Sequence, residues 1–268
     1  MNFIVALQPE ARPLIDRYKL VKRNDTTSFP IFENENHRLI ISGMGRINAA
    51  AATGFLLSQI EHDSEAILNL GIAGHGELPI NTPFIANRVF HLEEKNVHYP
   101  PPVIDCSIAR SALQTCNDSE KAYAQQIGYD MEAHSICSVA YKSITRELVQ
   151  IIKVVSDNPS RPLDSFEPRI ATDLIAAQLS LIVEIAEHLE SLAQSISKDP
   201  KIFSLIKKIK IRHHFSATQT HQLEKIIHQA HILGLEHSEI IKISNSSTTA
   251  RNLFHDLNQK IEPLRRLS

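Results

Sequence analysis

Three carboxylates in this sequence follow segments with the pattern of β-strands. Glu10 comes just after the apolar run NFIVAL, Glu132 just after the short run GYD, and Asp157 at the end of VQIIKVVS. Ligand sites in open α/β sheets lie outside the carboxyl ends of strands, where a carboxylate can exchange a proton with a bound molecule. Taken singly, each acid is more simply explained as a solvated loop residue or a helix N-cap. Three in one chain indicate a site.

The segments that must position these acids alternate between strand-like and helix-like patterns. The predicted strands cover residues 2–7, 38–43, 66–74, 83–90, 111–116, 126–130 and 149–156. The predicted helices start at Pro9, cover 46–60, follow Met131, and run as one long helix from about Arg169 to Ser195. This alternation predicts an α/β fold with a mixed, largely parallel sheet flanked by helices.

Two glycine-containing turns follow predicted strands, at Ser42–Arg46 and at Gly71–Gly76. Glycine lets a backbone approach a ligand closely and adopts positive φ angles without strain. Neither turn has the spacing of a dinucleotide-binding or P-loop motif. Either turn alone is explained equally well as a plain connection between a strand and a helix.

A change in charge divides the chain near residue 198. Residues 1–197 carry 16 Lys and Arg against 24 Asp and Glu, a net charge of −8, whereas the remainder carries 12 against 6, a net charge of +6. We therefore predict a domain at 1–197 and a basic, His-rich, all-helical extension at 198–268. The extension has apolar residues at helical spacing up to Gly234 and a second helical segment after a run of cap-forming residues.

The histidines and the positive charge of the extension could serve to bind a metal ion or a nucleic acid. His221, His228 and His231 have helical spacing that could hold a metal, but solvated helix residues explain them better, and we predict no metal. The positive charge would suit an acidic partner. Because no nucleic-acid motif accompanies it, nucleic acid is not the expected partner, and packing or oligomerisation is the better interpretation.

The composition predicts a cytoplasmic protein. No apolar run approaches the roughly 20 residues that cross a bilayer, and the N-terminus lacks the basic region and cleavage site of a signal peptide. The three cysteines, Cys106, Cys116 and Cys137, form no C-x-x-C pair, which favours a reducing compartment.

Taken together, these motifs resemble the nucleoside phosphorylase superfamily, and most of all its methylthioadenosine/S-adenosylhomocysteine nucleosidases. Five landmarks occur in the family's order across residues 1–195: VALQPEARPLI, SGMGRINAAAAT, NLGIAG, DMEAHS and KVVSDN. The resemblance implies cleavage of a purine N-glycosidic bond, without a cofactor or metal, in a homodimer or higher homo-oligomer. The tail after Lys198 lies outside the resemblance.

The resemblance also implies roles for individual residues. Asp157 would protonate purine N7 as a general acid, Glu10 would activate the attacking water, and Glu132 would bind ribose hydroxyls with Met131 packed under the sugar. The remaining residues expected to contact the substrate are Gly71, Ile72, Ala73, Gly74 and Ser156.

Water is favoured over phosphate as the nucleophile. Phosphorylases of the superfamily carry a Gly-Asp-Pro…Arg loop after the first strand, where this sequence has ALQPEARPL. Glu10 would repel a phosphate dianion there, although Arg12 and Arg46 keep a phosphorylase open as an alternative. The expected substrate is an adenine nucleoside or a related 5′-modified one.

Three departures from the family pattern bear on the substrate. Ile72 stands where the nucleosidases often have Ser, and Lys153 where they often have Arg. The interval between Gly76 and Asp130, which in the family carries a strand and loop that hold the base, is shortened. The stretch LQTCND is a candidate remnant of it, and Tyr99 is a candidate for an aromatic edge. The short interval motivates a second alternative, a catalytically inactive nucleoside-binding sensor or scaffold.

Overall fold

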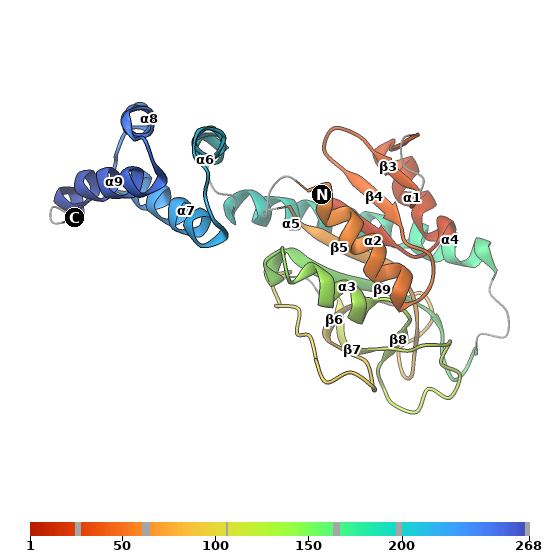
Figure 1. The fold of residues 1–268 in the computed structure, drawn as a ribbon. Coiled ribbons are helices and arrows are strands. Elements are labelled where there is room, and N and C mark those ends of the chain that lie inside the picture. The colour runs from red at the N-terminus through yellow and green to blue at the C-terminus, as the bar shows by residue number, and fades with distance from the viewer. Residues whose placement is uncertain (25–27, 61–64, 106, 163–166, 197–199, 266–268) are drawn as a thin grey trace. The chain divides into compact units, whose positions relative to one another are not determined.

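Nine strands within the described residues form one mixed sheet in the Met1–Ile196 unit. The computed structural model describes residues 1–24, 28–60, 65–105, 107–162, 167–196 and 200–265. The strands are β1 (Asn2–Val5), β2 (Val21–Lys22), β3 (Ile31–Glu33), β4 (Arg38–Ile41), β5 (Ile67–His75), β6 (Pro83–Phe90), β7 (Ala109–Thr115), β8 (Gly128–Asp130) and β9 (Val149–Asp157). Their order is β2-β3-β4-β1-β5-β8-β7-β6-β9, and β5 also pairs with β9 (Figure 1). The prediction of an α/β fold with a mixed sheet is confirmed.

The pairing between β5 and β9 closes five of these strands into a ring. Both strands are nine residues long, and they pair in parallel from Ile67 opposite Val149 to Gly74 opposite Asp157. Nearly every residue of the two strands is buried, as expected for parallel strands covered on both faces. Their carboxyl ends therefore sit side by side at one edge of the sheet.

Five α-helices in the described part of this unit flank the sheet, α1 (Gln8–Tyr18), α2 (Arg46–Ser58), α3 (Ala133–Ala140), α4 (Pro168–Ala177) and α5 (Leu179–Ile196). The α1 helix packs with α4, and α2 packs with α3. These two pairs lie on opposite faces of the sheet (Figure 1). The chain passes from β1 through α1 to β4 in one direction and back through α2 to β5 in the other, so right-handed crossovers place α1 and α2 on opposite faces.

The structure corrects two details of the predicted elements. The single helix expected from about Arg169 to Ser195 is two helices, because Gln178 leaves the helical conformation (φ −104°, ψ 7°). Its side-chain amide donates to the backbone oxygen of Asn81 at 2.9 Å, which anchors the break. The strands β2 and β3 were not predicted. They are two and three residues long, too short to show an alternating pattern.

The Ser197–Ser268 unit contains α6 (Pro200–Arg212), α7 (Ala217–Ile232), α8 (His237–Ser246) and α9 (Ala250–Arg265). Ser216 caps α7, its hydroxyl accepting from the Gln219 N–H, and Gly234 follows that helix with φ +79°. A separate apolar core includes Leu223, Ile227 and Leu253. The all-helical character of this region was predicted, although α6 and α8 were not located. Within the described part of the chain, no helix is both long and apolar enough to cross a membrane.

Candidate active site

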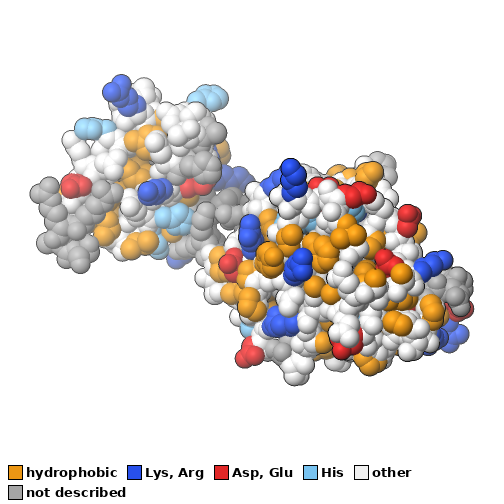
Figure 2. Space-filling view, turned by 90° about the horizontal axis from the view of Figure 1, so that it is seen from below, with side chains coloured by type: hydrophobic (Ala, Val, Ile, Leu, Met, Phe, Trp, Pro, Cys, Tyr) orange, Lys and Arg blue, Asp and Glu red, His pale blue; other side chains and the backbone are white. Residues whose placement is uncertain are grey.

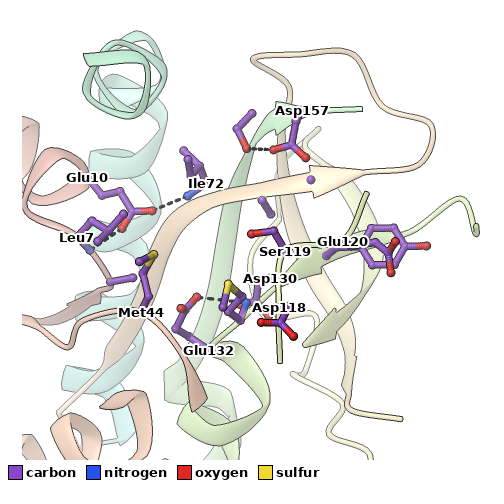
Figure 3. A pocket seen from close by; sticks show the side chains of 16 residues that line it. Leu7, Glu10, Met44, Ile72, Asp118, Ser119, Glu120, Asp130, Glu132 and Asp157 are labelled. Carbon is purple, nitrogen blue, oxygen red and sulfur yellow. Dashed lines mark hydrogen bonds between the residues drawn. The ribbon is translucent and has the colours of Figure 1, made fainter. Parts of the chain in front are cut away.

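One pocket lies at the carboxyl ends of β1, β5, β8 and β9 (Figure 3). Eight of the nine predicted site residues line it, and only Gly71 does not. The described residues of the lining are Ala6, Leu7, Glu10, Met44, Ile72, Ala73, Gly74, Asp118, Ser119, Glu120, Tyr129, Asp130, Met131, Glu132, Ser156 and Asp157. Segments far apart in the sequence thus meet here, as the strand-end pattern predicts.

Glu10 is held rigidly at one side of the pocket. It lies in the first turn of α1, and its carboxylate accepts hydrogen bonds from the Leu7 N–H (2.8 Å) and the Ile72 N–H (2.9 Å). A Cβ atom on Gly71 would come within 2.8 Å of Glu10 Oε1, so glycine at that position makes room for the carboxylate. Burial raises the pKa of Glu10 above its ordinary value, against the lowering effects of the Ile72 N–H and the Lys153 ammonium group. A raised pKa suits a general base.

Glu132 joins the pocket to the glycine turn that precedes α2. The N–H of Gly45 donates to Glu132 Oε1 at 2.8 Å, and the N–H of Met131 donates to the other oxygen at 3.3 Å. Burial and the neighbouring Asp130 carboxylate raise the pKa of Glu132 to about 7, despite the opposing effect of Lys153. This carboxyl group therefore changes its charge near neutral pH.

The contacts of Asp130 explain why this carboxylate is buried. Lys153, on the buried strand β9, places its ammonium group 3.0 Å from Asp130 Oδ2, and both side chains are almost inaccessible to solvent. Asp130 also accepts from the Thr115 hydroxyl (2.7 Å) and from the Ala133 N–H (2.9 Å) at the start of α3. Burial lowers the pKa of Lys153, but the carboxylates of Asp130, Glu132 and Glu10 outweigh this effect and raise it. Lys153 is thus a fixed positive charge beneath the pocket.

Asp157 lies across the pocket from Glu10 (Figure 3). The β5–β9 register shifts between Ala73 and Gly74, so that Asp157 pairs with Gly74. The hydroxyl of Ser156 donates to Asp157 Oδ1 at 2.5 Å, and the hydroxyl of Tyr123 donates to Oδ2 at 2.5 Å. A Cβ atom at Gly74 would lie 2.6 Å from Asp157 Oδ2. The glycine there therefore makes room for the carboxylate and its tyrosine partner.

The segment between β7 and β8 contributes Asp118, from the stretch LQTCND, together with residues that the sequence patterns did not single out. Asp118, Ser119 and Glu120 line the pocket, and Tyr123 lies behind Asp157. The shortened interval before Asp130 was the available signal, because a shorter connection must run close to the strand ends. Tyr99, which we proposed as an aromatic edge, is 57% exposed and does not line the pocket.

The ionisable side chains that line the pocket are acidic. Six of the described lining residues are acids, and no lysine or arginine is among them. The two arginines considered for phosphate binding are paired elsewhere. Arg12 contacts Asp16 at 2.9 Å, and Arg46 contacts Glu94 at 2.6 Å. A bound anion would meet carboxylates on several sides.

Known structures identify the fold, although no protein-family model and no curated protein matches the sequence. The chain is similar to a 5′-methylthioadenosine nucleosidase of Arabidopsis thaliana (TM-score 0.60, 16% identity, covering 70% of this chain and 94% of that one). It is also similar to methylthioadenosine/S-adenosylhomocysteine nucleosidases of Neisseria meningitidis with methylthio-immucillin-A (0.55, 17%, 71% and 98%) and of Colwellia psychrerythraea with adenine (0.55, 15%, 70% and 94%). The chain has the nucleoside phosphorylase fold of these proteins, which confirms the predicted structural resemblance.

Proposed function

We propose that this protein is a purine-nucleoside N-ribosidase, which hydrolyses the N-glycosidic bond of an adenine nucleoside or a related 5′-modified one. The observation that carries the proposal is the placement of Glu10 and Asp157 on opposite sides of one pocket (Figure 3), which Glu132 and Met131 also line. The reaction needs a proton donor for the departing purine, a general base that deprotonates the attacking water, and side chains that bind the sugar between them.

The proposed reaction uses each group once. Asp157 as a carboxylic acid gives its proton to purine N7 while the bond from C1′ to N9 breaks and its electron pair goes to the base. Positive charge builds on the ribosyl ring, as in other glycoside hydrolyses. A water attacks C1′ and transfers its proton to the Glu10 carboxylate, and solvent then restores both protonation states. Glu132 accepts hydrogen bonds from ribose hydroxyls, and Met131 packs under the sugar.

The charge of the pocket supports water over phosphate as the nucleophile. A phosphate dianion would have to enter a space lined by six acids, while Arg12 and Arg46 are engaged with Asp16 and Glu94. A neutral water has no such cost. The raised pKa of Glu10 also suits deprotonation of water.

The base and the 5′ group are proposed from the lining and from the related structures. Leu7, Met44 and Ile72 supply an apolar part of the pocket that would suit an uncharged 5′ substituent. The Colwellia psychrerythraea nucleosidase was solved with adenine, and that of Neisseria meningitidis with methylthio-immucillin-A. These ligands make adenine nucleosides the first substrates to test.

A panel of purine nucleosides, incubated with and without phosphate, tests the proposal. Hydrolysis predicts free base and free ribose in the absence of phosphate. Asp157→Asn should lower turnover by roughly 10²- to 10⁴-fold, the usual contribution of a general acid, and Glu10→Gln should abolish hydrolysis while substrate still binds. Dependence on phosphate would indicate a phosphorylase. Nucleoside binding without release of base would indicate the inactive sensor.

We also propose that the protein forms a homo-oligomer. Large apolar side chains are exposed at Met44, Ile47, Leu92 and Tyr99. Arg46 contacts both His91 and Glu94, which brings the start of α2 beside the segment after β6. Figure 2 shows, in addition, that apolar side chains gather on one face of the Met1–Ile196 unit. Exposed apolar patches of this kind mark protein interfaces. Sedimentation of the full chain at several concentrations tests the proposal, and a monomer throughout would contradict it.

We propose the cytoplasm as its compartment. Cys116 and Cys137 are free thiols in the structure, and free thiols persist in reducing compartments. Fractionation of cells that express the tagged protein would test this location.

A further inference from the structure

Tyr123 is a buried polar residue with no role in the reaction proposed so far. Its side chain is 7% exposed, and its hydroxyl lies 2.5 Å from Asp157 Oδ2. A separation of 2.5–2.7 Å is typical of a hydroxyl that donates to a carboxylate. The Ser156 hydroxyl engages the other oxygen at 2.5 Å, so both carboxylate oxygens of Asp157 have a donor.

The backbone around Tyr123 is held in one place. Tyr129 Oη accepts from the Gln125 N–H at 2.9 Å and donates to the Gln125 carbonyl at 3.2 Å. The rings of Tyr123 and Tyr129 meet edge to face, with centroids 6.2 Å apart and an interplanar angle of 75°. Tyr123 itself has φ +47°, a left-handed conformation that is unfavourable for a residue with a Cβ atom. Such a conformation persists only where the surroundings determine it.

Two glycines of β5 and its continuation let this segment approach. A Cβ atom at Gly74 would lie 3.1 Å from the Tyr123 ring, and one at Gly76 would lie 1.9 Å from the Gln125 carbonyl oxygen. The N–H of Gly76 also donates to the Ile127 carbonyl at 2.9 Å. The segment from Tyr123 to Ile127 is therefore fitted against the end of β5, beside Asp157.

We propose that Tyr123 is a positioning residue, which orients the Asp157 carboxyl group and stabilises the carboxylate that forms when Asp157 gives its proton to the purine. The inference rests on the proposed function, because it assigns Tyr123 a part in departure of the base. No new bond is made or broken. The Tyr123 O–H stays intact and donates throughout, and its hydrogen bond strengthens as negative charge develops on Asp157. An interaction that is stronger in the transition state than in the ground state raises kcat and leaves KM nearly unchanged.

The first experiment replaces Tyr123 by Phe, which keeps the ring and removes only the hydroxyl. A hydrogen bond to a charged group corresponds to about a 10- to 100-fold change, so kcat for a purine nucleoside should fall by that factor while KM stays within about twofold. Tyr18→Phe is the matched control. The Tyr18 hydroxyl is buried with no hydrogen-bond partner among the described residues, and Tyr18 does not line the pocket. Its loss should leave kcat unchanged.

A second substrate separates positioning from a general structural defect. The leaving group of 4-nitrophenyl β-D-riboside departs without protonation, so Tyr123→Phe and Asp157→Asn should both keep near wild-type rates with it. A variant with a distorted pocket would be slow on both substrates. In addition, the double variant Tyr123→Phe/Asp157→Asn should be no slower on the purine nucleoside than Asp157→Asn alone, because Tyr123 acts through Asp157.

The outcomes distinguish this inference from the proposed function. A wild-type protein that frees no base from any nucleoside overturns the proposed function and, with it, the role of Tyr123. An active wild type with an equally active Tyr123→Phe variant overturns the inference alone. So does a variant that is slowed equally on both substrates, or a double variant in which the two losses multiply.

Discussion

Lys153 offers the sharpest test of the electrostatics beneath the pocket. It is almost inaccessible to solvent and lies 3.0 Å from Asp130 Oδ2, and its charge also acts on Glu132 and Glu10. Lys153→Met keeps an unbranched side chain one atom shorter but leaves these buried acids without their cation. Removing one partner of a buried ion pair typically costs about 3–5 kcal/mol of the free energy of unfolding, and we expect a loss in that range at pH 8. Lys142→Met, at an exposed lysine, should change the free energy by no more than about 0.5 kcal/mol.

The assay is urea unfolding followed by tyrosine fluorescence. The chain has no tryptophan, and its five tyrosines all lie before residue 142, so the signal reports the Met1–Ile196 unit alone. Lys153 opposes the rise in the pKa of Glu132, so its removal should raise that pKa further above about 7. A carboxyl group whose pKa is raised by folding stabilises the fold below its unfolded value of about 4.5 and loses that contribution as pH rises through the folded value. The cost of Lys153→Met should therefore be smaller at pH 5 than at pH 8.

Two results would refute this reasoning. A loss below about 1 kcal/mol at pH 8 would mean that the acids are solvated or neutral without Lys153. A cost independent of pH would mean that the loss comes from packing and not from charge. The double variant Lys153→Met/Asp130→Asn should recover part of the loss, since it removes the buried carboxylate together with its cation.

Three further predictions follow from the site and the domain division. Gly71→Ala should displace the Glu10 side chain by a few tenths of an ångström and lower kcat about 10-fold or more. The control Gly54→Ala, with nothing within 4 Å of its Cβ position, should leave kcat unchanged and raise the melting temperature. KM for a riboside should rise as pH falls below about 7, because Glu132 takes up a proton; Glu132→Gln should also weaken the preference for ribosides over 2′-deoxyribosides, and an unchanged preference would exclude its role at ribose. Residues 1–197 alone should fold and keep nucleosidase activity, since the helical unit has its own core; a folded but inactive fragment would show that the tail completes the site.

The features predicted from the sequence are those encoded over a few neighbouring residues. The apolar runs at residues 2–7 and 149–156 predict buried strands, and a carboxylate after such a run is recognisable without knowledge of the rest of the chain. The meeting of Glu10 and Asp157 at one edge then follows from the parallel pairing of β1, β5 and β9. Glu132 reaches the same pocket from β8, which pairs antiparallel with β5, so its position depends on the path of the chain after β7 and not on the parallel strands alone.

The remaining features depend on contacts between distant segments. The pairing of Lys153 with Asp130 requires β8 and β9 to lie in the closed ring, which no alternation of elements reveals. The contact between Tyr123 and Asp157 requires a particular path for a segment that has no regular secondary structure. The break at Gln178 coincides with a hydrogen bond to Asn81, almost a hundred residues away, and the apolar periodicity continues across it.

The acidic lining of the pocket has a consequence for competition inside a cell. Nucleotides share their base and ribose with nucleosides, but each phosphate group brings negative charge. Two like charges 4 Å apart near a protein surface repel by about 4 kcal/mol, which is about a thousandfold in affinity. If the protein binds nucleosides as proposed, the acidic lining, with no basic side chain among its described residues, disfavours phosphorylated competitors by charge. On the proposed function, the pocket would then remain available to uncharged nucleosides in the presence of nucleotides.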